Sequence, residues 1–368
     1  MKNDKNMNII HIADCLRGGG VQNFLLSLLP EQVKLGHKVT LIVVERNTYD
    51  YCDKLEQKLK EHGVQVVNLG KERGNKISFL KTLFACRKTI KSIKPNVVNT
   101  HGGMSHLYGT FSTEFTHCLH VLTIHNAPEY WNVPNNLLNS NKPLVYCSDA
   151  AYDMRVQHNK NIVAINNGVS ADLICTKEIV DLRKELHLAK TDKIVVLVGS
   201  LRPQKNYEFL KQVVEKLQDS SIHFCISGGN YGAGYVNTSV FDDYPTIHCL
   251  GLRSDVSAIE NGSDLFLSCA TFEGLPIAVL EAFFNGIPCV LSPIEQHKRI
   301  VDGVGACIIP KDFTAEAFAE SILSGLDNHI SHDNIARNRS KAIDKFSISY
   351  AAKKYVDFYQ KNLGNEKK

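Results

Sequence analysis

The sequence predicts an α/β protein with two domains, each built on a parallel sheet that helices cover on both faces. Short β-branched runs alternate with helix-like stretches up to about residue 168, which is the pattern of parallel strands joined by helices. The same alternation starts again after a polar helical stretch at residues 180–192. A chain of 368 residues is also longer than one hydrophobic core usually organises, so two domains are expected.

In the first domain, we expect strands in the runs rich in Val, Ile and Leu, because such residues pack well in a buried sheet. These runs are NIIHIAD (8–14), KVTLIVVE (38–45), VQVVNL (64–69), NVVNTH (96–101), HVLTIH (120–125), LVYCSD (144–149) and IVAINNG (162–168). Helix-like stretches lie between several of them, in QNFLLSLLPEQVKLG (22–36) and ISFLKTLFACRKTIKSI (77–93). The first domain is therefore assigned to residues 1–168.

The second domain, assigned to residues 169–345, repeats this organisation. Its predicted strands are KIVVLVGS (193–200), IHFCISGG (222–229), IHCLG (247–251), DLFLSC (264–269), PCVLSP (288–293) and ACIIP (306–310). We expect helices at about 206–218 and within EGLPIAVLEAFFNG (273–286). The last stretch, residues 346–368, is amphipathic and ends in charge, and we expect it to form a helix that packs back on the first domain.

Composition excludes several classes of protein. No apolar run approaches the roughly 20 residues that span a bilayer, and the first residues lack a signal-peptide pattern. The eleven cysteines include no C-x-x-C pair, which argues against a zinc site or a disulfide scaffold and fits a reducing cytoplasm. A net charge of only +4 gives no reason to expect a nucleic-acid partner.

A glycine cluster, Gly18, Gly19 and Gly20, lies between the first strand and the first helix. Backbone can approach a ligand closely at such a turn, and a helix N-terminus favours a negative or polar group. Glu45 at the end of the second strand stands about where an NAD-binding enzyme keeps its ribose acid. The dinucleotide pattern is incomplete, because Asn23 occupies its third glycine position. A tight strand-to-helix turn without a ligand is the alternative.

A second strand-to-helix turn, in VGSLRPQKN (198–206), carries Arg202 and Lys205. Fixed positive charge beside the backbone N–H groups of a helix start suits a diphosphate without a metal ion. The alternative is that both cations are solvated on a surface loop.

Two acids stand eight positions apart in EGLPIAVLE, Glu273 and Glu281. Glu273 precedes Gly274 and Leu275, which offer backbone N–H groups, and Pro276 suits a first helical turn. Eight positions is a little over two helical turns, so Glu281 falls roughly on the Glu273 side, among apolar neighbours. A partly buried carboxylate needs hydrogen-bond donors, and the vicinal hydroxyls of a ribose or hexose supply two. A helix cap and a structural ion pair are the alternative roles.

Taken together, these motifs resemble the family-four retaining glycosyltransferases of GT-B fold, also called the glycosyl transferases group 1. The E-x7-E signature matches EGLPIAVLE, and VGSLRPQKN is similar to the phosphate turn of the family. LGLRSDV, the GGG cluster, VLTIHN with His125 and INNGV at the hinge follow in the order of the family. The resemblance covers nearly the whole chain and implies two Rossmann-like domains facing a cleft.

The resemblance also implies roles for individual residues. Glu281 would hold the nucleotide ribose, and Lys205 would neutralise the leaving diphosphate. Glu273 would face the transferred sugar, whose phosphate and hydroxyls also meet the N–H groups of Gly274 and Leu275. His125 would approach the sugar from the first domain, and the loop with Gly19 and Gly20 would lie near phosphate and acceptor.

Two positions depart from the family pattern. Ser200 replaces the usual arginine after the glycine, so either Arg202 reaches the phosphates or Lys205 acts alone. Ser170 replaces the aspartate that often follows the hinge. The expected catalytic residues are thus His125, Lys205 and Glu273, and the expected donor-binding residues are Gly19, Gly20, Arg202, Lys205, Glu273, Gly274, Leu275 and Glu281.

The function implied is transfer of a hexose-type sugar, with retention, from a nucleotide diphosphate to a hydroxyl of a glycan or lipid-linked glycan, in surface polysaccharide biosynthesis. We expect a UDP-sugar in preference to a GDP-sugar. No cofactor and no metal are expected, because the sequence has no Asp-x-Asp and His101 and His106 lack a third ligand at useful spacing. The alternatives are an NAD-dependent oxidoreductase, a GT-B sugar-nucleotide epimerase and a non-catalytic GT-B subunit.

Positive charge is concentrated in the first domain. Residues 53–95 contain eleven Lys and Arg residues but only four Asp and Glu residues. The helix in SFLKTLFACRKTIKSIK (78–94) intersperses its cations with Phe79, Leu80, Leu83, Phe84 and Ile90, as an interfacial helix does. We therefore expect a cytoplasmic enzyme held at the anionic inner face of the plasma membrane by salt-sensitive contacts. A solvated basic face over an ordinary core-facing stripe is the alternative.

Overall fold

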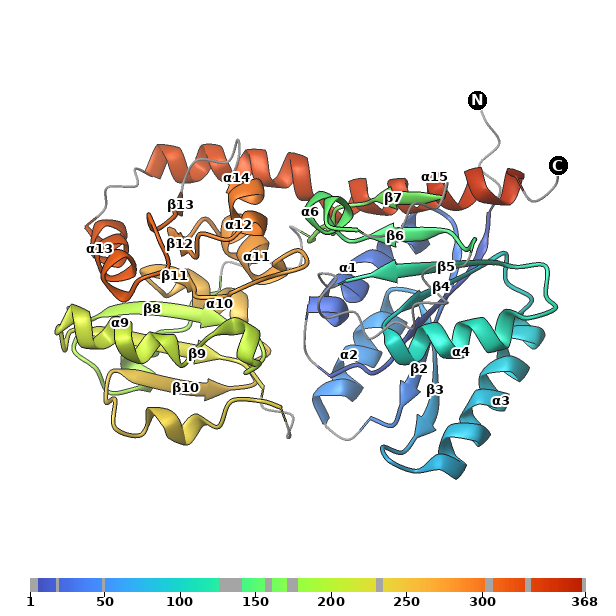
Figure 1. Cartoon of the computed structure of the whole chain (residues 1–368), viewed down its shortest axis with the longest axis horizontal. Coiled ribbons are helices and arrows are strands. Elements are labelled where there is room, and N and C mark those ends of the chain that lie inside the picture. Colours follow the sequence, from blue (N-terminus) through green and yellow to red (C-terminus); the bar gives the residue numbers. More distant parts are fainter. Residues whose placement is uncertain are drawn as a thin grey trace. The chain divides into compact units, whose positions relative to one another are not determined.

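The protein divides into two compact units (Figure 1). Unit 1 comprises Met1–Gly168 and Ile348–Lys368, and unit 2 comprises Val169–Ser347. The structure is a computed structural model that describes residues 6–17, 20–47, 50–125, 141–155, 161–170, 178–229, 234–301, 307–327 and 332–365. Each unit contains one parallel sheet, as the sequence predicts.

The sheet of unit 1 has seven parallel strands in the order β3-β2-β1-β4-β5-β6-β7. The strands are β1 (Asn8–Ala13), β2 (Lys38–Glu45), β3 (Gln65–Lys71), β4 (Val97–His101), β5 (Leu119–Ile124), β6 (Leu144–Tyr146) and β7 (Ile162–Ala164). The chain moves from β1 outward to β3 and then returns to place β4 on the other side of β1. The strand order therefore reverses between β1 and β4, and ligands of open α/β sheets bind where it reverses, beyond the carboxyl ends of the strands.

Helices cover both faces of this sheet. They are α1 (Gly20–Lys34), α2 (Asp50–Glu61), α3 (Lys76–Ile93), α4 (Gly103–Thr113), α6 (Asp149–Asp153) and α15 (Ile348–Asn365). Alternate residues of β1 enter different cores: Ile9 packs with α1 and α15, whereas Ile10 packs with α3 and α4. His11 lies on the same side of β1 as Ile9, so a polar side chain is placed in the layer between the sheet and α1.

The C-terminal helix α15 packs on unit 1, which confirms the expectation from its amphipathic pattern. The ring of Tyr355 lies 6.0 Å from that of Phe24 on α1. Asn99 on β4 donates from Nδ2 to the Tyr359 hydroxyl at 2.6 Å, and Thr123 on β5 donates to Asn99 Oδ1 at 2.9 Å. These hydrogen bonds satisfy buried polar groups and fix the register of α15 against the sheet.

The sheet of unit 2 has six parallel strands in the order β10-β9-β8-β11-β12-β13. They are β8 (Lys193–Val198), β9 (Ile222–Ser227), β10 (Ile247–Gly251), β11 (Leu265–Ser268), β12 (Cys289–Leu291) and β13 (Cys307–Ile308). The strand order reverses between β8 and β11, which places the expected ligand crevice of this unit at their carboxyl ends.

The helices of unit 2 lie on both faces of this sheet, in two hydrophobic cores (Figure 1). They are α8 (Leu182–Glu185), α9 (Phe209–Leu217), α10 (Val256–Asn261), α11 (Ile277–Asn285), α12 (Glu295–Val301), α13 (Ala315–Leu326) and α14 (His332–Phe346), with short 3-10 turns η2 (Pro203–Lys205) and η3 (Thr238–Phe241). One core includes α10, α11 and α14, and the other includes α9 and α13.

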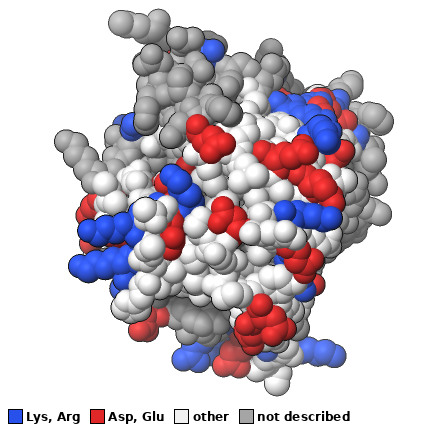
Figure 2. Space-filling view, turned by 90° about the vertical axis from the view of Figure 1, so that its left-hand side faces the viewer, with Lys and Arg blue, Asp and Glu red and all other residues white. Residues whose placement is uncertain are grey.

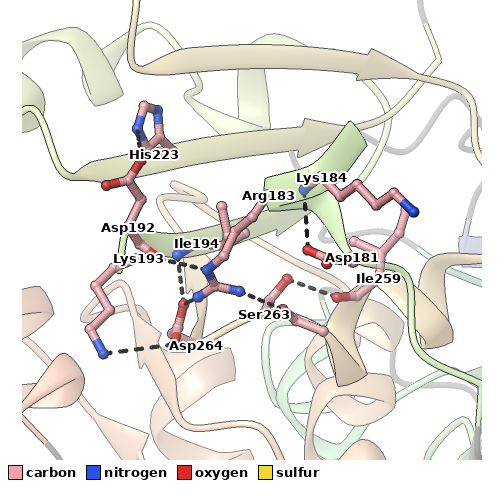
Figure 3. Close-up of polar contacts among 11 residues, drawn as sticks. Asp181, Arg183, Lys184, Asp192, Lys193, Ile194, His223, Ile259, Ser263 and Asp264 are labelled. Carbon is pink, nitrogen blue, oxygen red and sulfur yellow. Dashed lines mark hydrogen bonds and ion pairs between the residues drawn. The ribbon is translucent and has the colours of Figure 1, made fainter. Parts of the chain in front are cut away.

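Helix α8 is tied to the amino ends of the central strands of unit 2 (Figure 3). Asp264, just before β11, accepts a hydrogen bond from the backbone N–H of Ile194 at 2.7 Å and pairs with the Arg183 guanidinium on α8. Arg183 also donates to the carbonyl of Asp192 at 2.7 Å. This network lies at the edge of the sheet opposite its carboxyl ends, so it is a structural brace for α8.

The structure corrects part of the expectation for α3. Leu83 and Ile90 are buried and belong to the core, and Phe79 is half-buried against Tyr108. Leu80 and Phe84 are exposed, as an interfacial helix requires. The 3.6-residue period explains the division, because the apolar residues of α3 occupy two opposite faces and only one packs on the sheet. Among the described residues, no helix is long and apolar enough to cross a membrane.

Candidate active site

The site in unit 2 is built at the carboxyl ends of β8 and β11. The turn after β8 leads into η2, which ends at Lys205, and the loop after β11 carries Glu273. The backbone N–H of Thr271 donates to the carbonyl of Gln204 at 2.9 Å. This hydrogen bond joins the two loops directly, one residue before Lys205 and two residues before Glu273. Two positions far apart in the sequence are thus held together by adjacent parallel strands.

Lys205 and Glu273 form an ion pair, with 2.5 Å between Nζ and Oε1. Their side chains are only 18 % and 8 % exposed, so the pair is largely withdrawn from water. Gly199, at the end of β8, has φ +149°, and an added Cβ would lie 3.0 Å from Lys205 Cε. Glycine is therefore required there for the lysine to pass close to the strand end. A buried ion pair of this kind contributes little to the stability of the fold, but it holds the Lys205 ammonium in a fixed orientation for an anionic ligand.

The loop from Glu273 to α11 presents backbone N–H groups at the same edge. Pro276 is the N-cap residue, with φ −77° and ψ 90°, and α11 begins at Ile277. The helix ends at Gly286 in the left-handed conformation, φ 77°, which closes its last turn. Gly274 and Leu275 thus directly precede the positive end of the α11 dipole, which is a suitable place for phosphate or hydroxyl oxygens.

Glu281 lies half-buried on α11, next to an acid that the sequence analysis did not single out. Glu260 on α10 is buried, and burial, followed by the charge of Glu281, raises the pKa of Glu260 well above its usual value. Asn285 donates from Nδ2 to Glu260. Burial therefore favours the protonated form of Glu260 beside Glu281. The sequence contains a local sign that Glu260 is buried, because Glu260 directly follows Ala258 and Ile259 in the short helix α10.

Arg202 does not join the Lys205–Glu273 pair. It is exposed, and its Nε donates to the Tyr235 hydroxyl at 3.2 Å while its guanidinium lies 5.6 Å from the Tyr235 ring centroid. Lys205 is accordingly the cation that this arrangement places beside Glu273. Ser200, in the position of the family arginine, lies in the turn between Gly199 and Arg202.

Sequence analysis also missed His297 on α12. Its ring is fully buried, and Nδ1 lies 3.0 Å from the carbonyl oxygen of Ser292. A carbonyl can only accept, so Nδ1 carries the proton and Nε2 is a bare acceptor, without a partner among the described residues. Burial lowers the pKa of His297 to about 4, and the charges of Glu273 and Lys205 also act on it. His297 is therefore a neutral ring near the ion pair.

In unit 1, a chain of hydrogen-bonded side chains runs along the sheet towards His125. Gln32 Oε1 on α1 lies 2.8 Å from His11 Nε2, and His11 Nδ1 lies 2.8 Å from His101 Nε2. His101 Nδ1 lies 3.0 Å from His125 Nε2. His11, His101 and His125 stand at β1, β4 and the end of β5, which are neighbours in the sheet. The chain exists because the sheet order brings these strands together.

This arrangement determines which nitrogen of each ring carries the proton. Burial lowers the pKa of His11 to about 4, that of His125 to about 3 and that of His101 well below its usual value, so all three are neutral at pH 7. With the Gln32 oxygen accepting from His11, each neutral ring donates from Nε2 and accepts at Nδ1. His125 Nδ1 is then a bare acceptor, and among the described residues it has no hydrogen-bond partner.

The remaining predicted positions of unit 1 are only partly described. Gly18 and Gly19 lie outside the described residues, and Gly20 is the exposed first residue of α1. Glu45, which supported the NAD-binding alternative, pairs with Arg17 and Arg73. Its carboxylate is therefore used by arginines of the same unit. Within the described ranges, no group of three or more His, Cys, Asp or Glu side chains has the geometry of a metal site.

Comparison with protein families gives two matches that together account for most of the chain. Residues 18–173 match the model described as Glycosyltransferase Family 4, and residues 179–342 match the model described as Glycosyl transferases group 1. The chain is 23% identical over 313 residues to the UDP-Gal:alpha-D-GlcNAc-diphosphoundecaprenol alpha-1,3-galactosyltransferase of Escherichia coli, covering 77% of this chain and 80% of that protein.

A shorter match is to the N,N'-diacetylbacillosaminyl-diphospho-undecaprenol alpha-1,3-N-acetylgalactosaminyltransferase of Campylobacter jejuni. It is 24% identical over 182 residues, which is 50% of this chain and 48% of that protein. Among solved structures, a glycosyltransferase from Rickettsia africae has a TM-score of 0.80 at 17% identity, covering 98% of this chain and 100% of that one.

Anabaena Alr3699/HepE, in complex with UDP-glucose, also has a TM-score of 0.80, at 16% identity and with 98% of this chain and 100% of that chain covered. At such identities the structures establish the fold, and the family matches establish the kind of enzyme. The chain therefore belongs to the group 1 glycosyltransferases and has the GT-B fold of that family.

Proposed function

We propose that this glycosyltransferase moves a hexose-type sugar from a nucleotide diphosphate, a UDP-sugar in preference to a GDP-sugar, to a hydroxyl of a lipid-linked glycan. The observation that carries the proposal is the Lys205–Glu273 pair beside the N-terminus of α11. A cation and backbone N–H groups at one strand edge suit a leaving diphosphate, and the neighbouring carboxylate suits sugar hydroxyls.

The names of the relatives support the donor and acceptor classes. The Escherichia coli protein is named for UDP-Gal, and the Escherichia coli and Campylobacter jejuni proteins are both named for diphospho-undecaprenol acceptors and alpha-1,3 linkages. An α-linked product formed from an α-linked donor would be retention, and we propose this mechanism for the chain. We also propose a role in surface polysaccharide biosynthesis, which a lipid-linked acceptor would support.

In this proposal, negative charge grows on the leaving phosphate as the donor bond ionises, and Lys205 and the N–H groups of Gly274 and Leu275 stabilise it. One preorganised donor of this kind typically contributes about 10²–10³ in rate. Glu281 accepts from the ribose hydroxyls, and Glu273 exchanges part of its contact with Lys205 for the transferred sugar. His125 offers its bare Nδ1 to a hydroxyl. No metal and no cofactor enter these roles.

We further propose that α3 holds the enzyme at the anionic inner face of the plasma membrane. The exposed side of α3 carries three apolar residues, Ile77, Leu80 and Phe84, which are 80%, 54% and 60% exposed. Lys76, Lys81, Lys88 and Lys91 are exposed on the same helix. Each Lys near an anionic leaflet contributes about 1 kcal/mol, and the attraction fades within about one Debye length. By contrast, Figure 2 shows a face on which cationic and anionic side chains are interspersed.

Two measurements test this function. A panel of UDP- and GDP-sugars, each with and without a diphosphoundecaprenol-linked sugar, should give transfer that requires the acceptor and a UDP-sugar. Consumption of the donor without an acceptor would indicate an epimerase. Nucleotide binding without turnover would indicate a non-catalytic subunit, and a melting temperature raised by NAD(H) would indicate an oxidoreductase.

Sedimentation with anionic liposomes tests the membrane contact. The protein should sediment with the liposomes at low salt and not at high salt. No binding, or binding unaffected by salt, would exclude the electrostatic contact.

A further inference from the structure

A large cavity opens at the amino edge of the sheet in unit 1. Its volume is about 860 Å³, and it is lined by the residues just before β1, β4 and β5, namely Met7, Asn96 and Cys118. A six-residue strand spans roughly 20 Å, so this edge lies about that far from the carboxyl ends where His101 and His125 stand. The cavity is therefore separate from the candidate active site. Its volume is typical of a small-molecule site, for which about 300–1,000 Å³ is usual.

The walls of the cavity are mainly apolar and come from three parts of unit 1. Ile90 from the end of α3 and Leu363 from the end of α15 face it together with Met7, Pro95 and Phe115. An apolar wall built by two helix ends and two loops suits a flexible hydrocarbon chain, because the gain from burying apolar surface does not depend on direction.

The charged side chains that line the cavity are all positive among the described residues. Lys91 and Lys94 line the cavity, and among its described lining residues none is Asp or Glu. The other polar residues of the lining are Thr116, His117 and the uncharged amides Asn6, Asn96 and Gln360. This lining favours a ligand whose polar end is an anion, and a lysine ammonium is a point charge that suits a phosphate.

Two residues at the cavity have a backbone conformation that costs free energy. Phe115 has φ +58° although it is neither glycine nor asparagine, and its side chain is 92% exposed. Lys94 has φ 50° and ψ 60° directly before Pro95, where it is the C-cap of α3 and donates its backbone N–H to the Ile90 carbonyl. Bulky residues rarely adopt this conformation, and residues before proline are normally extended. Because the Phe115 ring is exposed, burial of its apolar surface does not compensate for the backbone strain. Backbone strain that the folded chain does not compensate is characteristic of ligand sites.

The cavity is continuous with the exposed side of α3. Lys91 belongs both to that side and to the cavity lining, one helical turn beyond Lys88 and two beyond Phe84. A ligand that enters beside Lys91 would therefore come from whatever lies against α3. A membrane leaflet supplies both of the required parts, hydrocarbon chains and phosphate.

We propose that this cavity binds an anionic phospholipid, with its phosphate at Lys91 and Lys94 and an acyl chain against Ile90, Phe115 and Leu363. This goes beyond sugar transfer, because it needs neither the donor nor the acceptor. It depends on the proposed membrane contact only for the source of the lipid. A bound lipid would cover Phe115 and would hold the enzyme more specifically than charge along α3 can.

The experiment uses the full-length protein and dihexanoyl phosphatidylglycerol kept below its micelle concentration, so that single molecules are offered without a membrane. Calorimetry should detect saturable binding, with dihexanoyl phosphatidylcholine bound at least about 10-fold more weakly because its headgroup carries no net charge. The variant Lys91→Gln/Lys94→Gln should weaken binding of phosphatidylglycerol by about 10-fold or more. The matched variant Lys76→Gln/Lys81→Gln, which removes two charges from the start of α3, should leave it unchanged.

Other results would overturn the proposal. Equal affinity for both lipids, equal losses in both variants, or full competition by inorganic phosphate would each mean that no phospholipid site exists here. An unchanged circular dichroism spectrum and melting temperature of Lys91→Gln/Lys94→Gln serve as the check on folding, and its binding of UDP serves as the check on the donor site. That binding should equal that of the wild type, so loss of the lipid site and failure of the donor site give different results. A second variant, Leu363→Arg, should abolish lipid binding because it puts a charged side chain into the apolar part of the cavity lining and leaves Lys91 and Lys94 in place.

Discussion

Lys205 Nζ lies 2.5 Å from Glu273 Oε1, although 68 positions separate the two residues in the sequence. The pair stands where β8 and β11 end side by side, at the reversal of strand order in unit 2. Because both side chains are largely buried, each charge needs the other to offset the free-energy cost of its removal from water. A diphosphate that approaches Lys205 must therefore share this cation with Glu273.

Replacing Lys205 by Gln should lower turnover far more than donor binding. Charge on the leaving phosphate grows only in the transition state, so kcat should fall by about 10²–10³ while the Kd for the UDP-sugar changes much less. Steady-state kinetics with calorimetry of the bound donor separates the two effects. Arg202→Gln is the matched control, because Arg202 is exposed and bonded to Tyr235, and it should be nearly silent. A folded Lys205→Gln enzyme with normal kcat would move the phosphate role elsewhere.

Glu281→Ala should weaken nucleotide binding by about 1–3 kcal/mol, because the ribose hydroxyls lose the carboxylate that accepts from them. Titration of UDP measured by calorimetry gives the difference directly. Glu260→Gln provides the control: burial raises the pKa of Glu260 and favours its neutral form, which glutamine imitates, so UDP affinity should be unchanged. If Glu281→Ala binds UDP as the wild type does, the ribose role is wrong.

Much of the fold follows from local sequence patterns. The β-branched runs at Asn8–Ala13 and Lys193–Val198 are strands because their side chains fill buried positions on both faces of a sheet. The Glu-Gly-Leu-Pro run predicts the start of α11, and Gly286 predicts its end. Such signals lie within a few residues of the feature they specify, so they can be read without knowing the tertiary structure.

Other features could not be read in this way. His11, His101 and Gln32 meet only because β1 and β4 pair and α1 packs over them, and no local pattern records that pairing. The same applies to the burial of Glu260 and His297. The periodicity of α3 was also ambiguous, because its apolar residues point both into the core and out of it. Sequence predicted the types of residue in the site better than their partners.

His125 should be the Nε2–H tautomer, with Nδ1 bare, because the Gln32 oxygen accepts from His11 and each neutral ring of the chain then donates from Nε2. The ring ¹⁵N shifts of histidine-labelled protein distinguish the two tautomers, and the variant His125→Gln identifies its signals. His101→Ala removes the acceptor for the Nε2 proton, so it should give a mixture of tautomers at His125. A pure Nδ1–H form in the wild type would reverse the direction of the chain.

Unit 1 should lose stability as the pH falls below about 6.5, the pKa of histidine in the unfolded chain. Burial lowers the pKa of His11 to about 4 and that of His106 to about 3. The unfolded state then binds protons that the folded state does not, so stability is complete above pH 6.5 and falls below it. At pH 5.5 each such residue should cost about 1.4 kcal/mol.

Hydrogen exchange of the β1 and β4 amides at pH 7.5, 6.5 and 5.5, corrected for intrinsic rates, measures this dependence. His106→Gln should show a shallower loss of protection than the wild type, and His62→Gln, at an exposed position of the same unit, should follow the wild type. Parallel curves for all three proteins would show that His106 does not contribute.

The most direct test of the central claim is transfer of a radiolabelled hexose from a UDP-sugar to a diphosphoundecaprenol-linked sugar, comparing the wild type with Lys205→Gln and Glu281→Ala. We predict an α-linked product from the wild type, a rate about 10²–10³ lower for Lys205→Gln at saturating donor, and a raised donor requirement for Glu281→Ala. Transfer that is undiminished in both variants, or no transfer from any UDP- or GDP-sugar by the wild type, would contradict the account.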